Sequence, residues 1–150
     1  TMEVANAWIP VVWGLAGVRP PVLHDAPYLA RSVTEFWGLR WNRIVGTWLR
    51  LNVLKPLVRR RHPRAGVAAA FAVSGLIHGY LALTELPWPW AALMAGFFLA
   101  QLPLVLIERA LALPRRHPAL ARAWTVAGLA LMSPLFTAPM LRIIDGGGGG

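Results

Sequence analysis

The sequence contains no cysteine, which excludes disulfide bonds, thiolate nucleophiles and zinc–cysteine sites. Charge is also scarce, because only 14% of the 150 residues are charged whereas 57% are hydrophobic. This balance is too apolar for an ordinary soluble domain. The length suits one domain, and the composition indicates that this domain lies in a membrane.

Acidic residues are the rarer sign of charge, with 6 Asp and Glu against 15 Lys and Arg and a net charge of +9. A net charge of this size usually raises the question of nucleic-acid binding. Here long apolar runs separate the basic residues, so we expect membrane lipids with anionic headgroups as partners and no nucleic acid. Arginine supplies 14 of the 15 basic residues. Together with abundant alanine and leucine, this indicates a bacterial source and a location in the inner (cell) membrane.

Three apolar stretches reach the roughly 20 residues that a helix needs to cross a bilayer, namely 65–86, 88–107 and 121–141. A shorter apolar stretch at 4–18 could form the end of a further span or a tilted one. We therefore predict an all-α fold, a polytopic helical membrane protein with about three to four transmembrane helices and one amphipathic interfacial helix. The membrane domain is expected to cover residues 1–145, followed by a flexible glycine tail at 146–150.

The charges between the spans predict their orientation. The loop at 59–64 reads RRRHPR and the loop at 114–122 reads PRRHPALAR, whereas the turn at 85–89 reads ELPWP. Because cytoplasmic loops carry an excess of lysine and arginine, we expect both basic loops in the cytoplasm and the 85–89 turn outside. The chain opens on Thr1 without a signal-peptide pattern, and we expect it to be a piece of a longer protein.

The segment 32–58 has the pattern of a helix that lies on the membrane surface. Ser32 is a candidate helix cap, and Glu35 three residues later completes the spacing of a capping box. Four residues fall within an arc of about 80° on a continuous helix: Arg40, Arg43, Thr47 and Arg50. Apolar and aromatic residues occupy the opposite side, so we predict one amphipathic helix at the interface.

Asn42 does not lie with these arginines. On the same continuous helix it sits about 120° from the centre of their arc, on the apolar side. A neutral amide in apolar surroundings must find hydrogen-bond partners. It could bond a neighbouring backbone group, or it could serve the chemistry of a site.

His78 is the second polar residue in unusual surroundings, because it lies in the middle of the span at 65–86 between Gly75 and Gly79. An ionisable group at membrane depth is a functional-site hypothesis by default, and desolvation favours the neutral imidazole, which can accept a proton. Ser74 and Glu85 share its helix face, and Glu85 could line the same polar cavity nearer the outer surface. The alternative is a packing histidine bonded across helices, and the Gly-x-x-x-Gly spacing permits close helix approach in either case.

Two sequence blocks carry a resemblance to a known family. The first is FWGLRWN at 36–42, followed by Lys55–Pro56, and the second is SGLIHGYL at 74–81. In this order and separation they resemble the wax synthase branch of the membrane-bound O-acyltransferase (MBOAT) family, over roughly residues 32–82. The matching positions are Phe36, Trp37, Gly38, Trp41 and Asn42 in the first block, and Ser74, Gly75, Leu76 and His78 in the second.

The resemblance implies transfer of a fatty acyl group from acyl-coenzyme A, as co-substrate, to the hydroxyl of a long-chain alcohol or a glyceride such as diacylglycerol. The family's two signature positions fall on His78 and Asn42. His78 would act as general base on the acceptor hydroxyl, and Asn42 would orient a reacting group by hydrogen bonding. Neither a metal nor another cofactor is expected.

Further residues are expected to contact substrate: Trp37, Trp41, Ser74, Arg40 and Arg43. The arginines could attract the phosphates of coenzyme A as readily as lipid headgroups.

The sequence departs from the family at Gly79, where wax synthases often carry an acidic residue, and full-length members have more spans than this chain. Two other hypotheses stay open. The chain could be a non-catalytic integral membrane protein, a truncated or degenerate relative that packs or binds lipid. It could also be a basic protein that binds nucleic acid or disrupts membranes, which the apolar spans disfavour.

Overall fold

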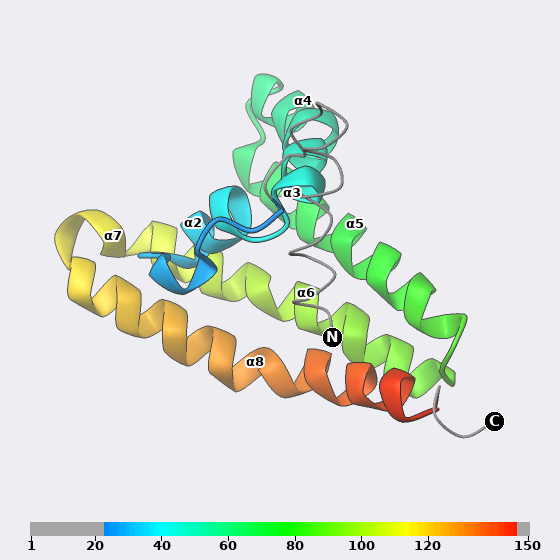
Figure 1. Cartoon of the computed structure of the whole chain (residues 1–150). Helices are drawn as coiled ribbons and strands as arrows, with labels where there is room; N and C mark the ends of the chain where they lie inside the picture. Colours follow the sequence, from blue (N-terminus) through cyan, green and yellow to red (C-terminus); the bar gives the residue numbers. More distant parts are fainter. Residues whose placement is uncertain (1–22, 147–150) are drawn as a thin grey trace, which may run out of the picture.

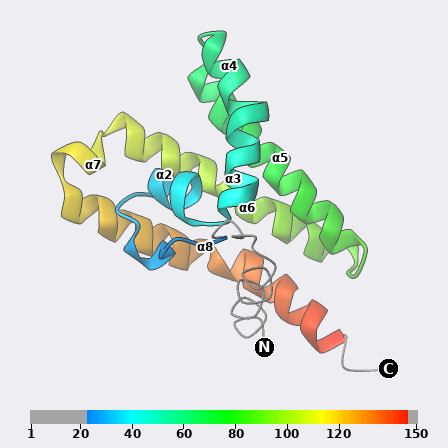
Figure 2. The same ribbon diagram turned by 45° about the horizontal axis from the view of Figure 1, so that its top comes forward.

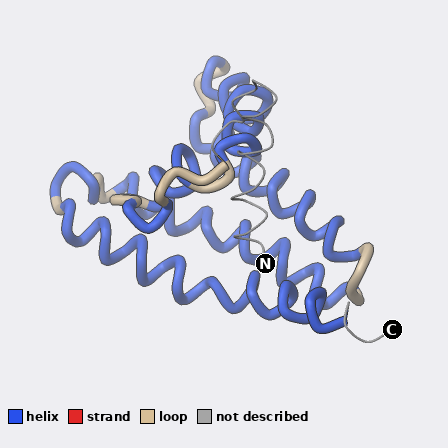
Figure 3. The backbone as a smooth tube through the Cα atoms, in the orientation of Figure 1, coloured by secondary structure: helices blue, strands red, loops and turns tan. Residues whose placement is uncertain are grey.

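The computed structural model describes residues 23–146, and in that range it contains helices and short connections but no strand. Three helices are long and apolar enough to cross a membrane (Figures 1 and 3): α5 (Pro63–Leu83), α6 (Trp88–Ala110) and α8 (Pro118–Gly146). They confirm the all-α class and the three predicted spans. The stretch at 4–18 and residues 147–150 lie outside the described residues.

Helix α6 packs against both α5 and α8. Its approach to α5 depends on the two glycines that flank His78. A Cβ atom added at Gly75 would lie 3.0 Å from the carbonyl oxygen of Ala95, and one added at Gly79 would lie 3.1 Å from the Ala95 Cβ. The Gly-x-x-x-Gly spacing therefore brings the α5 backbone close to α6, as predicted.

The segment 32–58 is not one helix, and that prediction is wrong. It begins with α2 (Val33–Glu35) and the wider helical turn η2 (Phe36–Arg40). After a break at Trp41 and Asn42 it continues as α3 (Arg43–Leu49), η3 (Arg50–Leu54) and α4 (Lys55–Arg59). Figure 1 shows α3 and α4 projecting at an angle from the long helices. The break separates Arg40 from Arg43 and Arg50, so the predicted arc of arginines does not form.

The break has a local cause in the backbone of Asn42. Its φ of 37° and ψ of 63° lie in the left-handed region, which asparagine tolerates better than most residues. At the start of α2, Ser32 Oγ accepts a hydrogen bond from the Glu35 N–H at 2.9 Å, so the predicted cap is confirmed. The Glu35 carboxylate accepts from the Arg31 N–H at 2.9 Å, one residue earlier than in a capping box.

The main hydrophobic cluster joins the start of this segment to the spans. Its buried members are Val33, Val67, Phe71, Leu104 and Val105, and Trp37 packs against them. The FWGLRWN motif is therefore anchored in the helix bundle and does not lie free on its surface. Figure 2 shows α2 lying over the region where α6 and α8 run side by side.

The two basic stretches between the helices lie away from the α5–α6 turn. The basic connection from α4 to α5 and the basic helix α7 (Leu113–Arg116) lie at the ends of α5 and α6 opposite to the α5–α6 turn. At the other end, the guanidinium of Arg142 in α8 lies 5.0 Å from the ring centroid of Trp90 at the start of α6. Figure 1 shows the α4–α5 connection and α7 well apart from each other, because α5 and α6 diverge toward these ends.

Candidate functional site

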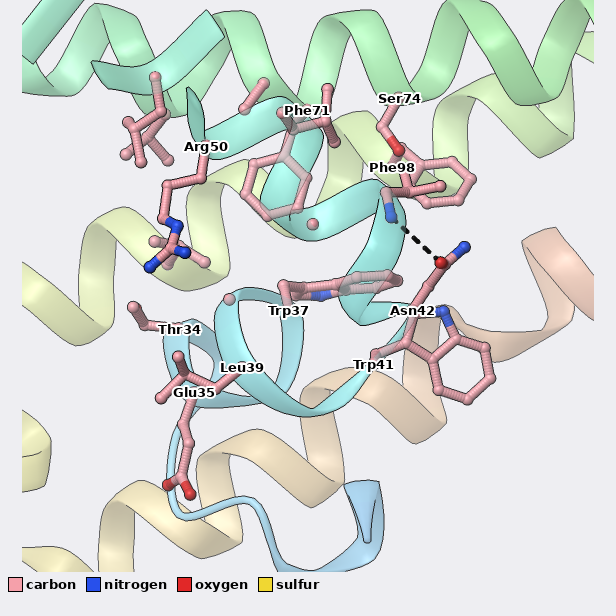
Figure 4. A pocket seen from close by; sticks show the side chains of 18 of the residues that line it. Thr34, Glu35, Trp37, Leu39, Trp41, Asn42, Arg50, Phe71, Ser74 and Phe98 are labelled. Carbon is pink, nitrogen blue, oxygen red and sulfur yellow. Dashed lines mark hydrogen bonds between the residues drawn. The ribbon is translucent and has the colours of Figure 1, made fainter. Parts of the chain in front are cut away.

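A cavity of about 490 Å³ lies between the FWGLRWN motif and helices α5 and α6. Both signature residues, Asn42 and His78, line it. So do three of the predicted substrate contacts, Trp37, Trp41 and Ser74. Figure 4 shows Asn42, Ser74 and Phe98 on one side of Trp37, with Arg50, Thr34 and Glu35 on the other. The cavity thus brings together residues that are far apart in the sequence.

The His78 ring is held by a main-chain carbonyl. Its Nδ1 lies 2.8 Å from the carbonyl oxygen of Ser74, one turn earlier in α5. Since a carbonyl oxygen can only accept, Nδ1 is the protonated nitrogen, and in the neutral imidazole Nε2 is then the one with the lone pair. The ring also packs on Phe98, with ring centroids 4.1 Å apart. Within residues 23–146 the structure shows no hydrogen bond to Nε2, so this nitrogen can accept a proton from a bound molecule.

Asn42 caps helix α3. Its Oδ1 accepts a hydrogen bond from the Val45 N–H at 3.3 Å (Figure 4, dashed line). The expectation that Asn42 could bond a neighbouring backbone group is therefore confirmed. The cap uses only the side-chain oxygen Oδ1. Across the described part of the chain, the Nδ2 N–H groups of the same side-chain amide form no hydrogen bond. Asn42 can therefore cap the helix and still donate into the cavity.

Leu23, His24 and Asp25 form hydrogen bonds to the residues on both sides of the break at Trp41 and Asn42. Sequence reasoning missed these three residues. The Asp25 N–H donates to the Arg40 carbonyl at 2.9 Å, and the Arg43 N–H donates to the Leu23 carbonyl at 2.9 Å. Between them, His24 Nδ1 accepts from the Asn42 N–H at 3.2 Å. The His24 ring also packs on Trp41, with centroids 4.5 Å apart. His24 and Asn42 are 18 residues apart, and no sequence pattern predicts that they are in contact.

The aromatic residues of the motif face the protein interior. Trp37 meets Phe71 and Phe97 edge to face, with centroids 6.2 Å and 5.9 Å apart. Trp41 stacks on Phe36 at 5.5 Å and an interplanar angle of 16°. Such pairs stabilise beyond the area that they bury. The tryptophans therefore form a wall of the cavity.

Two buried polar residues of α6 also support the motif. Gln101 Oε1 accepts from the Trp37 indole N–H at 3.3 Å. The Glu108 carboxylate accepts from the Val33 N–H at 2.6 Å and from the Thr34 hydroxyl at 2.7 Å. Both side chains are almost fully inaccessible to solvent, with 0% and 1% exposure. The sequence reasoning missed both. Gln101 lies within the predicted span at 88–107 and carried the same signal as His78, a polar residue at membrane depth, whereas Glu108 lies just beyond that span.

The two arginines that were predicted to contact substrate do not line the cavity. Arg40 and Arg43 are not among the cavity-lining residues, whereas Arg50 and Arg109 are. The Arg40 Nε lies 2.6 Å from Glu35 Oε1, and Arg43 Nη1 lies 4.0 Å from Asp25 Oδ2. Burial alone would raise the pKa of Glu35, but hydrogen bonds from the Arg31 N–H and from Arg40 outweigh it and hold this pKa below its ordinary value.

Two further expectations concern acidic groups. Glu85 is exposed in the α5–α6 turn and does not line the cavity, so its suggested place there is wrong. The Cβ position of Gly79 points at α6, which leaves no room there for the acidic residue that wax synthases often carry. Over residues 23–146 no group of histidine and acidic side chains is arranged to hold a metal ion.

Comparison with known proteins identifies the family. A sequence model described as "Membrane bound O-acyl transferase family" matches residues 20–100, which is more than half of the chain. The chain belongs to this family. The match covers both motif blocks, so the resemblance predicted from them is confirmed. Together with the three apolar helices, membership makes this O-acyl transferase family chain an integral membrane protein.

The curated relatives carry one kind of name. The chain is 37% identical to "Probable long-chain-alcohol O-fatty-acyltransferase 2" of Arabidopsis thaliana over 74% of its length, which covers 34% of that relative. It is 40% identical to "Long-chain-alcohol O-fatty-acyltransferase" of Simmondsia chinensis over 49% of its length, which covers 23% of that relative. The chain thus spans about a third or less of these relatives. No solved structure matches this member of the O-acyl transferase family.

Proposed function

We propose that this chain carries the reacting centre of a membrane O-acyltransferase, which transfers a fatty acyl group from acyl-coenzyme A to the hydroxyl of a long-chain alcohol and so forms a wax ester. The observation that carries the proposal is that His78 and Asn42, which are 36 residues apart in the sequence, line the same largely apolar cavity. The relatives named long-chain-alcohol O-fatty-acyltransferases support the alcohol as acceptor. Diacylglycerol presents the same hydroxyl chemistry and is the second acceptor to test.

The proposed reaction needs one base and no covalent enzyme intermediate. His78 Nε2 takes the proton of the acceptor hydroxyl. The acceptor oxygen then attacks the thioester carbonyl carbon, and the carbon–sulfur bond breaks. The imidazolium returns its proton to the leaving thiolate, which gives the ester and free coenzyme A. The Asn42 Nδ2 donates to the oxygen on which negative charge develops.

Arg50 and Arg109 are proposed to bind the phosphates of coenzyme A. Both line the cavity and both are exposed, and Figure 4 shows Arg50 on the side of Trp37 away from Asn42. Guanidinium groups bind phosphate with charge-assisted hydrogen bonds. The contacts predicted for Arg40 and Arg43 stay a weaker proposal, because Arg40 already bonds Glu35.

The arginine-rich composition supports a bacterial cell membrane as the location of the protein.

The catalytic assignment is tested by expressing the chain in membranes and supplying labelled palmitoyl-coenzyme A with hexadecanol or diacylglycerol. We expect ester formation to fall by roughly 100-fold or more in H78A and in N42A, because a general base and an oxyanion donor each contribute at least this much. Ester formation that does not depend on His78 would overturn the assignment.

The phosphate contacts have a matched control at the same end of the bundle. R50Q and R109Q are expected to raise the KM for palmitoyl-coenzyme A, since each removes a charged contact. R115Q removes an exposed arginine that does not line the cavity, and its KM should equal that of wild type. If R50Q and R109Q also kept the wild-type KM, Arg50 and Arg109 would not bind coenzyme A, and lipid headgroups would be their remaining proposed partners.

The alternative is a non-catalytic integral membrane protein, a truncated relative with a packing or lipid-binding role. The matches cover only 34% and 23% of the two relatives named above, so the activity in their names stays a proposal for this chain. Transfer by wild-type chain that H78A abolishes would exclude this alternative. A wild-type chain inactive with both acceptors, beside an active longer protein, would show that the chain does not act alone.

A further inference from the structure

Two buried polar side chains on one face of α6 hold the beginning of the FWGLRWN motif. Gln101 and Glu108 are seven residues apart, which places them two turns apart on the same side of the helix. Gln101 bonds the indole of Trp37, and Glu108 bonds the first turn of α2. The motif is therefore fastened to a transmembrane helix at two points.

Glu108 makes the stronger of these attachments. Its Oε2 accepts from the Val33 N–H at 2.6 Å, and its Oε1 accepts from the Thr34 hydroxyl at 2.7 Å and the Thr34 N–H at 3.3 Å. The N–H groups of a first helical turn have no partner within the helix. Hydrogen bonds to a charged acceptor are shorter and stronger than neutral ones. The carboxylate thus fixes where α2 begins.

The carboxylate of Glu108 is buried, which is unfavourable unless its oxygens find hydrogen-bond donors. Glu108 is 1% exposed, and a buried charge is unfavourable unless it is well compensated. Across residues 23–146 the ion pairs involve Glu35 and Asp25 but not Glu108. The N–H groups of Val33 and Thr34 and the Thr34 hydroxyl supply this compensation, so Glu108 is held by the segment that it binds.

The attachment continues directly to the proposed catalytic amide. From Val33 to Arg40 the chain is helical without interruption, and Asn42 follows two residues later. Trp37 lies midway and is wedged between Phe71 and Phe97. A helical run transmits a shift of its first turn to its last. We propose that Glu108 is a positioning residue of the acyl-transfer site, whose carboxylate sets where Asn42 stands relative to His78. Its catalytic consequence rests on the function proposed above.

The positioning is measurable without any activity, because the chain has no cysteine of its own. Spin labels are placed on the pair G38C and G96C, one in η2 and one in α6. A Cβ atom at either position meets no atom within 4 Å; Gly38 lines the cavity, so the labelled pair serves the distance measurement and not the kinetics. Electron–electron double resonance then gives the distance distribution between the motif and α6.

Three backgrounds carry the label pair: E108Q, E108L and the control E85Q. E108Q keeps one acceptor oxygen and removes the charge, whereas E108L removes both acceptors. We expect the distribution to broaden or shift in E108L and, to a smaller extent, in E108Q. E85Q changes an exposed acid in the outer turn and should match wild type. An unchanged distribution in both Glu108 variants would overturn the proposal, and E108Q decides alone should E108L fail to insert.

Kinetics separate positioning from general stability. We expect E108Q to lower kcat by roughly 10- to 100-fold, because small displacements of a catalytic group have effects of this size. The KM values for palmitoyl-coenzyme A and hexadecanol should stay within about twofold of wild type, because Glu108 touches neither substrate. A changed distance with unchanged kcat would overturn the positioning role. Activity that survives H78A would instead overturn the proposed function and leave the distance result standing.

Discussion

The Nδ1 atom of His78 lies 2.8 Å from the main-chain carbonyl oxygen of Ser74, so the imidazole is fixed by the backbone of its own helix. In a transmembrane helix the carbonyl of residue i lies beside the side chain of residue i+4. The proton on Nδ1 is thereby set without any acidic partner. The Ser74 hydroxyl, by contrast, lines the cavity and is free to contact a substrate.

The two parts of Ser74 can be separated by S74A. The carbonyl that holds His78 stays in this variant and only the hydroxyl is lost. We therefore expect kcat within about twofold of wild type and a higher KM for the alcohol, the pattern of a lost binding contact. Steady-state ester formation at varied hexadecanol concentration checks this. A loss of kcat as large as in H78A would show that the hydroxyl takes part in the chemistry.

The two roles of Asn42 can be separated by N42D and N42A. An aspartate keeps an oxygen for the Val45 N–H and tolerates the left-handed backbone, but it loses the Nδ2 donor. We expect N42D to keep the thermal midpoint of wild type and to lose activity as fully as N42A. In N42A the lost cap should also lower stability by about 1 kcal/mol. Full activity in N42D would reduce Asn42 to a helix cap.

The positions of the spans could be predicted because they depend on local information. Apolar length defines α5, α6 and α8. His78 stood out because it is polar within an apolar span, whereas Asn42 stood out only on the projection of a continuous helix, which the break at Asn42 removes. These signals need only the residues within a few turns of each position.

The break in the segment 32–58 could not be predicted in the same way. Projecting residues at about 100° each assumes a continuous helix, and a left-handed residue at position 42 invalidates that projection for everything beyond it. The contacts that hold the break come from distant parts of the chain. His24 is 18 residues from Asn42, and Glu108 is 75 residues from Val33. Only the fold brings them together.

The close approach of α5 and α6 can be tested by G79A. The added methyl group would lie 3.1 Å from the Ala95 Cβ and 3.4 Å from the Ala91 carbonyl oxygen, so one helix must move. We expect a loss of about 1–3 kcal/mol in stability, seen as a lower thermal midpoint in detergent. G96A is the matched control, because a Cβ atom at Gly96 meets nothing within 4 Å. A midpoint in G79A equal to that in G96A would contradict the packing.

The contact between Glu35 and Arg40 predicts a dependence of stability on pH. Because the pKa of Glu35 is held below its ordinary value of 4.5, the ionised form stabilises the fold. This contribution is present above the ordinary value and is lost as pH falls through the lower folded-state pKa. The carboxylate and Arg40 are about one-fifth exposed, so the contribution should be about 1 kcal/mol or less. The thermal midpoint of wild type should exceed that of E35Q at pH 7, and the difference should vanish at strongly acidic pH. A difference that persists in acid would show that the mutation acts through packing and not through the charge.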